Sequence, residues 1–212
     1  MSVEPTKPFP HLQRNLVAIL RGVAPHEAVD IAKAIFEAGI EAIEVPLNSP
    51  DPFRSIEAIV NALPETALVG AGTVLSAQQV DDLARAGGKL LVSPNIDADV
   101  MARAKNHAMV TMPGVFTPTE AFRALALGAS ALKFFPASAL GPKGISAICA
   151  VLPAGTIVGA VGGVSDADFA DFARIGVKTF GLGSSLYKPG MTAAEVGNKA
   201  IAAAAAWDAA CS

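Results

Sequence analysis

The chain has 212 residues, of which 52% are hydrophobic and 17% are charged, and its formal net charge is −3. This length suits a single domain over residues 1–212, and the composition excludes a disordered chain. The slightly acidic balance, without a basic patch, argues against binding to nucleic acid or to an anionic membrane surface.

The amino-terminal stretch, MSVEPTKPFPHLQ, is polar and proline-rich and lacks the apolar core of a signal peptide. We therefore expect a short N-terminal extension before the first strand, in a cytoplasmic protein. Cys149 and Cys211 lie far apart and no Cys/His cluster appears, so neither a metal site nor a disulfide framework is expected. The longest alanine-rich run, near the C-terminus, is too short and too weakly apolar to span a membrane.

Short runs of apolar and β-branched residues recur at regular intervals along the chain. They predict eight strands, at residues 16–20, 41–45, 67–71, 89–93, 108–112, 131–135, 156–160 and 178–182. The segments between them have helical spacing. In residues 26–39, for example, Ala28, Ile31 and Ile35 fall on one apolar face.

Turn and cap residues agree with this alternation of strands and helices. Glycine stands just before four of the predicted strands and is typical of helix C-termini, at Gly39, Gly87, Gly128 and Gly176. Thr117, followed by Pro118 and Glu120, has the pattern of a helix N-cap with a capping box. Ser165 has the same role in the sequence SDADF.

Eight strands that alternate with helices, each almost continuously apolar, predict an α/β fold with a parallel sheet covered by helices. Eight is the number of strands that closes a (β/α)₈ TIM barrel, which is the architecture we expect. The alternative is an open doubly wound sheet, but the chain lacks a GxGxxG motif after its first strand.

Polar and glycine residues gather where the predicted strands end. In a barrel these carboxyl ends meet on the rim that carries the active site. Ordinary turn chemistry would account for the glycines and prolines singly, but not for charged side chains within or next to apolar strands. The charged residues of this kind are Arg21, Glu44 and Lys133.

Lys133 lies in the apolar run ALKFFP, where an ammonium group is costly to bury. Its stem could pack while the charged end reaches water. Alternatively, desolvation lowers its pKa and frees a neutral amine that can form a Schiff base with a ketone or aldehyde. In that case Phe134, Phe135 and Pro136 would limit water around the amine.

Glu44 lies within the strand sequence AIEVP, between Ile43 and Val45. Because side chains alternate along a strand, Glu44 should face the barrel interior when its two neighbours face the helices. It would there form a structural ion pair with Arg21 or Lys133, or act as a general acid and base beside the amine. The two roles are compatible.

Gly162 and Gly163 follow the seventh predicted strand, and Gly183 and Ser184 follow the eighth. Phosphate sites in TIM barrels commonly occupy this position, because glycine lets backbone N–H groups approach the anion. We expect a phosphate-bearing ligand here, with the Ser184 hydroxyl as an additional donor.

The motifs AILRG, IEVPLNSP, GAGTVL, SPN, LKFFPAS, GGV and GLGSSLY occur in this order between Val17 and about Pro189. In their content and spacing the chain resembles the class I 2-keto-3-deoxy-6-phosphogluconate and -galactonate aldolases. The resemblance implies a homotrimeric barrel without a metal or an organic cofactor, acting on a sugar-acid phosphate. It makes Lys133 the Schiff-base lysine and Glu44 the acid/base. The positions it matches to substrate or phosphate binding are Arg21, Thr73, Pro94, Pro113, Gly162, Gly163, Gly183 and Ser184.

Two further positions that the resemblance implies for substrate binding, Asn48 and Val161, depart from the gluconate type. Asn48 stands where gluconate-type members have arginine, and Val161 stands where they have threonine. Both departures resemble the galactonate branch, and valine cannot donate a hydrogen bond to the C4 hydroxyl. One pocket residue changes discrimination by only a few kcal/mol, so a gluconate-specific or dual-specificity enzyme stays open. A phosphate-binding isomerase or epimerase and a non-catalytic sugar-phosphate binder are the remaining alternatives.

Overall fold

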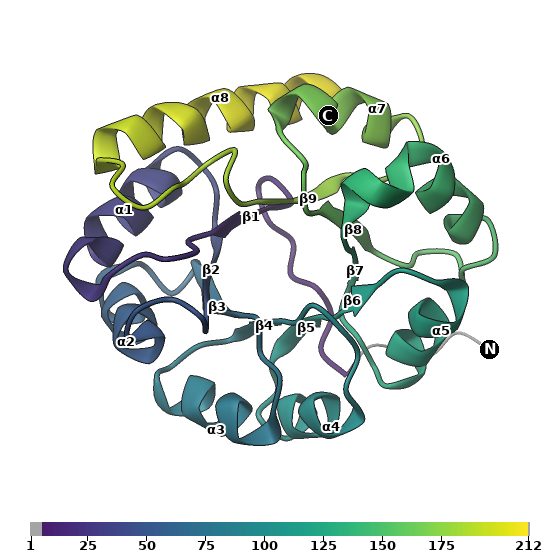
Figure 1. Cartoon of the computed structure of the whole chain (residues 1–212), viewed down its shortest axis with the longest axis horizontal. Helices are drawn as coiled ribbons and strands as arrows, with labels where there is room; N and C mark the ends of the chain where they lie inside the picture. The colour runs from purple at the N-terminus through teal and green to yellow at the C-terminus, as the bar shows by residue number, and fades with distance from the viewer. Residues whose placement is uncertain (1–5, 212) are drawn as a thin grey trace.

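A computed structural model describes residues 6–211, which form a ring of parallel strands enclosed by helices (Figure 1). The strands are β1 (Leu16–Ile19), β2 (Ala42–Pro46), β3 (Leu68–Gly72), β4 (Leu90–Val92), β5 (Val110–Met112), β6 (Gly114–Val115), β7 (Leu132–Phe134), β8 (Val158–Val161) and β9 (Thr179–Leu182). The helices are α1 (Pro25–Glu37), α2 (Pro52–Ala62), α3 (Ala77–Arg85), α4 (Ala98–Asn106), α5 (Pro118–Ala126), α6 (Ala137–Cys149), the 3₁₀ turn η1 (Asp166–Asp168), α7 (Phe169–Ala173) and α8 (Ala193–Cys211).

The strand order is β5-β4-β3-β2-β1-β9-β8-β7-β6, and every pairing is parallel. The two terminal strands of this order, β5 and β6, are separated only by Pro113, so the ring closes through the chain itself. The predicted barrel is therefore confirmed, and the open sheet is wrong. The fifth predicted strand, residues 108–112, is present as β5, whereas β6 was not predicted. The two are separate strands because Pro113 between them has no N–H to offer the ladder.

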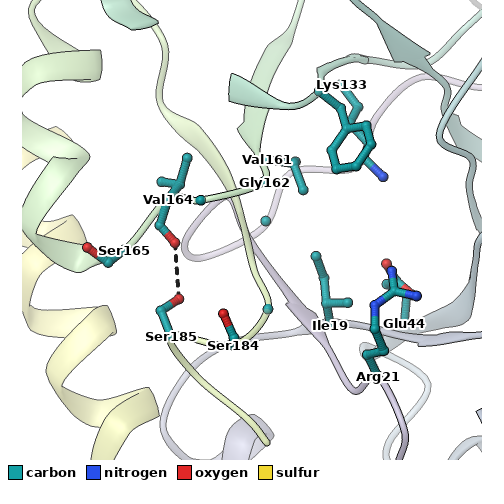
Figure 2. Close-up of a pocket in the computed structure, with 14 residues that line it drawn as sticks. Ile19, Arg21, Glu44, Lys133, Val161, Gly162, Val164, Ser165, Ser184 and Ser185 are labelled. Carbon is teal, nitrogen blue, oxygen red and sulfur yellow. Dashed lines mark hydrogen bonds between the residues drawn. The ribbon is translucent and has the colours of Figure 1, made fainter. Parts of the chain in front are cut away.

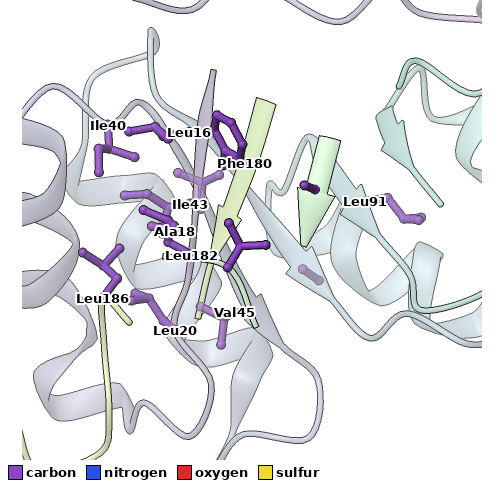
Figure 3. Close-up of a cluster of buried hydrophobic side chains, with 14 of the residues drawn as sticks. Leu16, Ala18, Leu20, Ile40, Ile43, Val45, Leu91, Phe180, Leu182 and Leu186 are labelled. Carbon is purple, nitrogen blue, oxygen red and sulfur yellow. The ribbon is translucent and has the colours of Figure 1, made fainter. Parts of the chain in front are cut away.

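Side chains on each strand alternate between two apolar cores. The outward-facing residues pack against the helices, as Figure 3 shows for Leu16, Ala18, Ile43, Val45 and Phe180. The inward-facing residues form a second cluster inside the ring, from Phe9, Leu12, Val17, Ile19, Ala42, Leu68, Leu90, Val92, Val110, Met112, Ala131 and Val161. Alternation along each strand thus decides which residues can reach a site inside the barrel.

The N-terminal extension lies across the amino ends of the strands, where the purple segment crosses the ring in Figure 1. Its backbone N–H groups bond to chain that precedes two distant strands: Thr6 donates to the Gly128 carbonyl at 3.1 Å and Gln13 to the Glu41 carboxylate at 2.6 Å. Phe9 and Leu12 are buried against the inner cluster. The predicted extension therefore closes one end of the barrel.

The predicted helix ends are present. Gly39, Gly87, Gly128 and Gly176 all have φ between +78° and +85°, the left-handed conformation that terminates a helix. At the start of α5, Thr117 and Glu120 form the reciprocal capping box. The Ser165 N–H and hydroxyl both donate to the carboxylate of Asp168 at the start of η1.

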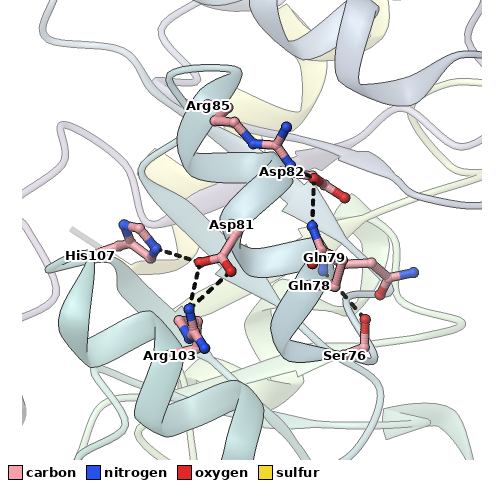
Figure 4. Close-up of polar contacts among 8 residues, drawn as sticks. All are labelled: Ser76, Gln78, Gln79, Asp81, Asp82, Arg85, Arg103 and His107. Atoms are coloured by element: carbon pink, nitrogen blue, oxygen red, sulfur yellow. Dashed lines mark hydrogen bonds and ion pairs between the residues drawn. The ribbon is translucent and has the colours of Figure 1, made fainter.

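A polar cluster joins α3 to α4 on the outside of the barrel (Figure 4). Asp81 accepts from Arg103 at 3.0 Å and lies 2.8 Å from His107, and the hydrogen bond with His107 lowers the pKa of Asp81 below its usual value. These contacts connect neighbouring helices at some distance from the strand ends.

Between residues 6 and 211, no helix has both the length and the apolar character needed to cross a membrane. The same residues contain no group of three or more His, Cys, Asp or Glu side chains placed to hold a metal ion.

Candidate active site

A cavity of about 620 Å³ opens at the carboxyl ends of the strands (Figure 2). Its wall comes from strands on opposite sides of the ring and from the loops that follow them. The lining residues are Ile19, Arg21, Glu44, Lys133, Phe135, Val161, Gly162, Gly163, Val164, Ser165, Gly181, Gly183, Ser184 and Ser185. Eight of the twelve predicted site residues thus line one cavity: Arg21, Glu44, Lys133, Val161, Gly162, Gly163, Gly183 and Ser184.

Lys133 is in the middle of β7 and points into the barrel, with a residue exposure of only 6%. Its backbone N–H donates to the carbonyl of Pro113 at 3.0 Å, which holds β7 against the interrupted strand. Its Nζ lies 4.7 Å from the centre of the Phe135 ring. Phe135 therefore shields the amine as expected, whereas Phe134 faces the outer core and Pro136 is exposed.

Glu44 projects into the same cavity from β2, with an exposure of 2%, while Ile43 and Val45 face the helices. In Figure 2 its carboxylate and the Lys133 amine point toward one another across the cavity. The Oε2 atom of Glu44 is buried without a hydrogen-bond partner. Among residues 6–211, neither Arg21 nor Lys133 forms an ion pair with it, so the structural ion pair is not present in this form.

Burial changes the proton affinity of both groups in the direction that chemistry needs. Desolvation raises the pKa of Glu44 to about 7, with the charges of Lys133 and Arg21 acting in the opposite direction. Desolvation lowers the pKa of Lys133, an effect that Glu44 opposes and Arg21 reinforces. A lysine with a lowered pKa and a carboxyl group with a raised pKa therefore share one cavity.

Arg21 follows β1 at the cavity mouth, and its guanidinium is fixed by the next loop around the ring. Its Nη1 donates to Oδ1 of Asn48 at 2.6 Å. The N–H of Gly22 donates to the Ser49 hydroxyl at 2.9 Å, which ties the same two loops together. Asn48 does not line the cavity itself, so its contact with the site in this structure is through Arg21.

The loops after β8 and β9 form the opposite wall. Gly162 and Gly163 have φ of +89° and +73°, a conformation that glycine adopts without strain. Added Cβ atoms there would come within 3.0 Å of Phe135 and Ser138. The Ser185 hydroxyl donates to the Val164 carbonyl at 3.1 Å and joins the two loops (Figure 2). The wall is built of backbone and hydroxyl groups, as an anion site requires.

Val161 gives the cavity an apolar side between the amine and the glycine loops. A Cβ on Gly181 would lie 2.7 Å from Cγ2 of Val161 and 3.3 Å from Cδ1 of Ile19, so these three residues are in close contact. Ile19 and Gly181 were not predicted to line the site. Strand alternation would have identified both, because each lies two residues after an inward-facing position, Val17 and Thr179 respectively.

Besides Asn48, three predicted site residues do not line the cavity. Thr73, directly after β3, is half-buried with φ of +58°. Pro94 is half-buried after β4, in a turn where the Ser93 hydroxyl donates to the Asn95 carbonyl at 2.7 Å. Pro113 is buried between β5 and β6 and supports the backbone of Lys133. Val164, Ser165 and Ser185 line the cavity without having been predicted to do so, although Val164 and Ser185 fall within the motifs GGV and GLGSSLY and Ser165 was expected as a helix N-cap.

Comparisons with known proteins agree with this geometry. Residues 11–202 match the family model described as KDPG and KHG aldolase. A relative from Rhizobium meliloti, named probable 2-dehydro-3-deoxy-6-phosphogalactonate aldolase, is 60% identical over 95% of each chain. The 2-dehydro-3-deoxy-6-phosphogalactonate aldolase of Escherichia coli is 49% identical over 88% of this chain and 91% of its own. A solved structure described as native KDPGal superposes with a TM-score of 0.93 at 46% identity, covering 96% of this chain and 98% of the other.

Proposed function

This chain belongs to the KDPG and KHG aldolase family of carbon–carbon lyases, and from that premise we propose that it is a class I aldolase of 2-dehydro-3-deoxy-6-phosphogalactonate. The products are pyruvate and D-glyceraldehyde 3-phosphate, and the reaction is reversible. The proposal rests above all on one observation. A buried, desolvated lysine and a buried carboxyl group face one cavity, and two glycine-rich loops form its far wall.

The reaction begins with attack of the neutral Lys133 amine on the C2 ketone of the substrate. Loss of water from the resulting carbinolamine gives an iminium ion, and Glu44 supplies and accepts the protons of this step. The lowered pKa of Lys133 favours the unprotonated amine that the attack requires. The raised pKa of Glu44, about 7, suits a group that both gives and takes protons near neutral pH.

Cleavage follows when Glu44, directly or through a water molecule, removes the proton of the C4 hydroxyl. The C3–C4 bond breaks, its electron pair moves into the iminium, and glyceraldehyde 3-phosphate leaves as the aldehyde. Protonation of the remaining enamine at C3 and hydrolysis of the imine release pyruvate and restore the amine. The iminium is the electron sink, so this scheme uses no metal or organic cofactor, and activity should persist in a chelator.

The glycine loops are the natural site for the phosphate end of the substrate. We assign phosphate binding to the backbone N–H groups of Gly162, Gly163 and Gly183 and to the Ser184 hydroxyl. An anion held there anchors one end of the chain so that C2 meets Lys133, which converts binding energy into positioning. We assign substrate contact to Arg21, and also to Thr73, Pro94 and Pro113, although these last three do not line the cavity.

The preference for the galactonate epimer rests on Val161 and Asn48. Val161 presents methyl groups to the cavity and cannot donate a hydrogen bond to a C4 hydroxyl. The Oδ1 atom of Asn48 accepts a hydrogen bond from Nη1 of Arg21 at 2.6 Å. The names of the two curated relatives support the same preference.

A coupled assay with both C4 epimers, in which lactate dehydrogenase reports pyruvate, tests this function. We expect faster turnover of the galactonate epimer. Borohydride reduction in the presence of pyruvate should add the pyruvoyl group to Lys133, as seen by mass spectrometry. Equal turnover of both epimers would indicate dual specificity, faster turnover of the gluconate epimer would refute the argument from Val161 and Asn48, and no adduct at Lys133 would refute the aldolase mechanism.

Val161→Thr tests whether Val161 contributes to the preference for the galactonate epimer. It restores a hydroxyl at nearly constant volume and should shift the kcat/KM ratio toward the gluconate epimer by about tenfold. Val164→Thr, on the same loop wall, is the matched control and should leave the ratio of the two epimers unchanged.

We further propose that the protein acts as a homotrimer in the cytoplasm. Several large apolar side chains are exposed on the single chain, among them Leu75, Phe116 and Phe122 at 52%, 41% and 45%, and burial between subunits would remove them from water. Cys149 and Cys211 are free thiols, which suits a reducing compartment. Sedimentation equilibrium should give three times the mass of one chain, and cell fractionation tests the compartment.

A further inference from the structure

Gly72, the last residue of β3, lies directly beneath the carboxylate of Glu44. In the register of β2 with β3, Glu44 pairs with Gly70 and Pro46 pairs with Gly72, so Gly72 is the next inward position on the neighbouring strand. A Cβ atom built on Gly72 would fall on Oε2, Cδ and Oε1 of Glu44, which are the three nearest atoms. The side chain of Glu44 therefore occupies the space that any side chain at position 72 would need.

Backbone conformation does not explain why position 72 is a glycine. Gly72 is absent from the positive-φ glycines of the described chain, so an L-residue could adopt its backbone without strain. Gly70, two residues earlier, differs because its Cβ would collide with the backbone of Leu90 on β4. At Gly72 the three nearest atoms all belong to one side chain, that of the proposed acid/base.

Hydrogen bonds do not hold the carboxylate of Glu44 in place either. Its Oε2 is buried without a partner, and within residues 6–211 its carboxylate forms no ion pair. A long acidic side chain with 2% exposure must nevertheless keep one orientation to reach a substrate. Packing is then what can orient the Glu44 side chain. The space in which it packs is open because position 72 has no side chain.

We propose that Gly72 is a positioning residue for Glu44: the missing side chain at position 72 creates the seat in which the carboxylate rests, aimed at the substrate with both oxygens free. This inference rests on the proposed function in so far as Glu44 is the acid/base of that reaction. The seat itself is a property of the fold. Glycine is required at the end of β3 because the Glu44 side chain fills the space beside it, and not because the backbone there has a positive φ.

Gly72→Ala is the direct test. Because the colliding atoms are the end of a flexible side chain, we expect the variant to fold and to displace Glu44 into the cavity. Turnover should fall by 10- to 100-fold in kcat, since a misplacement of about 1 Å can cost about that much, with KM changed less than threefold. Gly144→Ala on α6, where a Cβ meets only Leu140 at an ordinary 3.5 Å, is the matched control and should keep full activity.

A second background separates positioning from general damage. If Gly72 acts only through Glu44, then adding Gly72→Ala to Glu44→Ala should change the residual kcat less than twofold, because the colliding atoms are gone. An equal loss in both backgrounds would overturn the proposal. Should Gly72→Ala fail to fold alone, the double variant must fold as well as Glu44→Ala does, and a double variant that also fails to fold would overturn it.

A titration that does not depend on turnover keeps this test separate from the proposed function. The side-chain carboxyl of Glu44, labelled with ¹³C and assigned by its loss in Glu44→Gln, should titrate near its raised pKa of about 7 in the parent protein. In Gly72→Ala it should titrate at least half a pH unit lower, because the carboxylate moves out of its buried seat. An unchanged titration would overturn the role of Gly72 even if the aldolase reaction were confirmed, and a shift without aldolase activity would uphold the seat while refuting the proposed function.

Discussion

The two ends of the barrel interior are built from the same strands but differ in character. At the amino ends, the inward positions Val17, Ala42 and Ala131 are apolar and are covered by Phe9 and Leu12 of the N-terminal extension. Two residues further along the same strands, the inward positions become Ile19, Glu44 and Lys133 and line an open cavity.

This difference shows how a barrel separates stability from chemistry along a single strand. The closed end excludes water by packing side chain against side chain, so its residues contribute to folding. The open end has glycine in place of side chains at Gly72, Gly162 and Gly181, and the vacated space lets charged groups face a ligand. Substitutions at the two ends should therefore affect different measurements.

The largest effect is expected at the open end from Lys133→Met. Loss of the amine removes the imine, so kcat should fall by at least about 1,000-fold, as for other nucleophile deletions. The variant should fold normally because it replaces a buried amine by an apolar chain of similar length. Borohydride trapping and the coupled assay measure the loss, and Lys105→Met on the exposed face of α4 should match the parent.

Glu44→Gln should have the next largest effect, reducing kcat by about 100- to 1,000-fold, the usual range for losing a general acid or base. In the parent, kcat/KM should rise as the pH is raised through about 7, since Glu44 acts as a base only after losing its proton. In Glu44→Gln that dependence should disappear. A profile that is unchanged by the substitution would show that another group supplies it.

Trapping of pyruvate on Lys133 should persist in Glu44→Gln at a reduced rate, which separates imine formation from C3–C4 cleavage. Glu37→Gln, exposed at the end of α1, is the control and should reproduce the parent profile.

At the closed end, Phe9→Ala should affect folding and leave chemistry intact. Removing a buried phenylalanine should lower the free energy of unfolding by about 3 kcal/mol. We expect kcat to stay within twofold of the parent at temperatures where the variant is folded. Urea denaturation measures the loss, and Ile201→Ala, at an exposed position of α8, should cost far less. A fall in kcat without a change in stability would contradict the separation of the two ends.

The smallest effect is expected at Ser185, whose hydroxyl bonds to the Val164 carbonyl at 3.1 Å and joins the two glycine loops. Ser185→Ala should raise KM for the phosphorylated substrate by about fivefold, the equivalent of one hydrogen bond of about 1 kcal/mol. Trapping of pyruvate, which carries no phosphate, should be unaffected. Ser185→Thr keeps the hydroxyl and should restore KM, and a failure to do so would place the effect outside this bond.

Much of the site followed from local pattern because inward and outward positions alternate along a strand. Ile43 and Val45 had to face the helices, which placed Glu44 inside. The same alternation applies to Lys133 between Leu132 and Phe134, and it explains why Phe134 does not shield the amine as predicted. Alternation along a strand does not predict which residues of different loops are in contact. Asn48 was expected at the substrate, but in the fold its amide oxygen accepts from Arg21, because the loops after β1 and β2 are neighbours in the ring.

The sequence by itself determined the strands, the helix ends at its glycines and the inward direction of Lys133 and Glu44, because these depend on residues close together in the chain. Only the tertiary structure decided what those side chains meet. Closure of the ring sets β2 opposite β7, with β1, β9 and β8 between them on one side, and so brings two groups that are 89 positions apart in sequence to one cavity. It also laid the N-terminal extension across the other end and set Gly72 beneath Glu44. These are contacts between distant segments, which register and barrel closure fix and local sequence pattern does not.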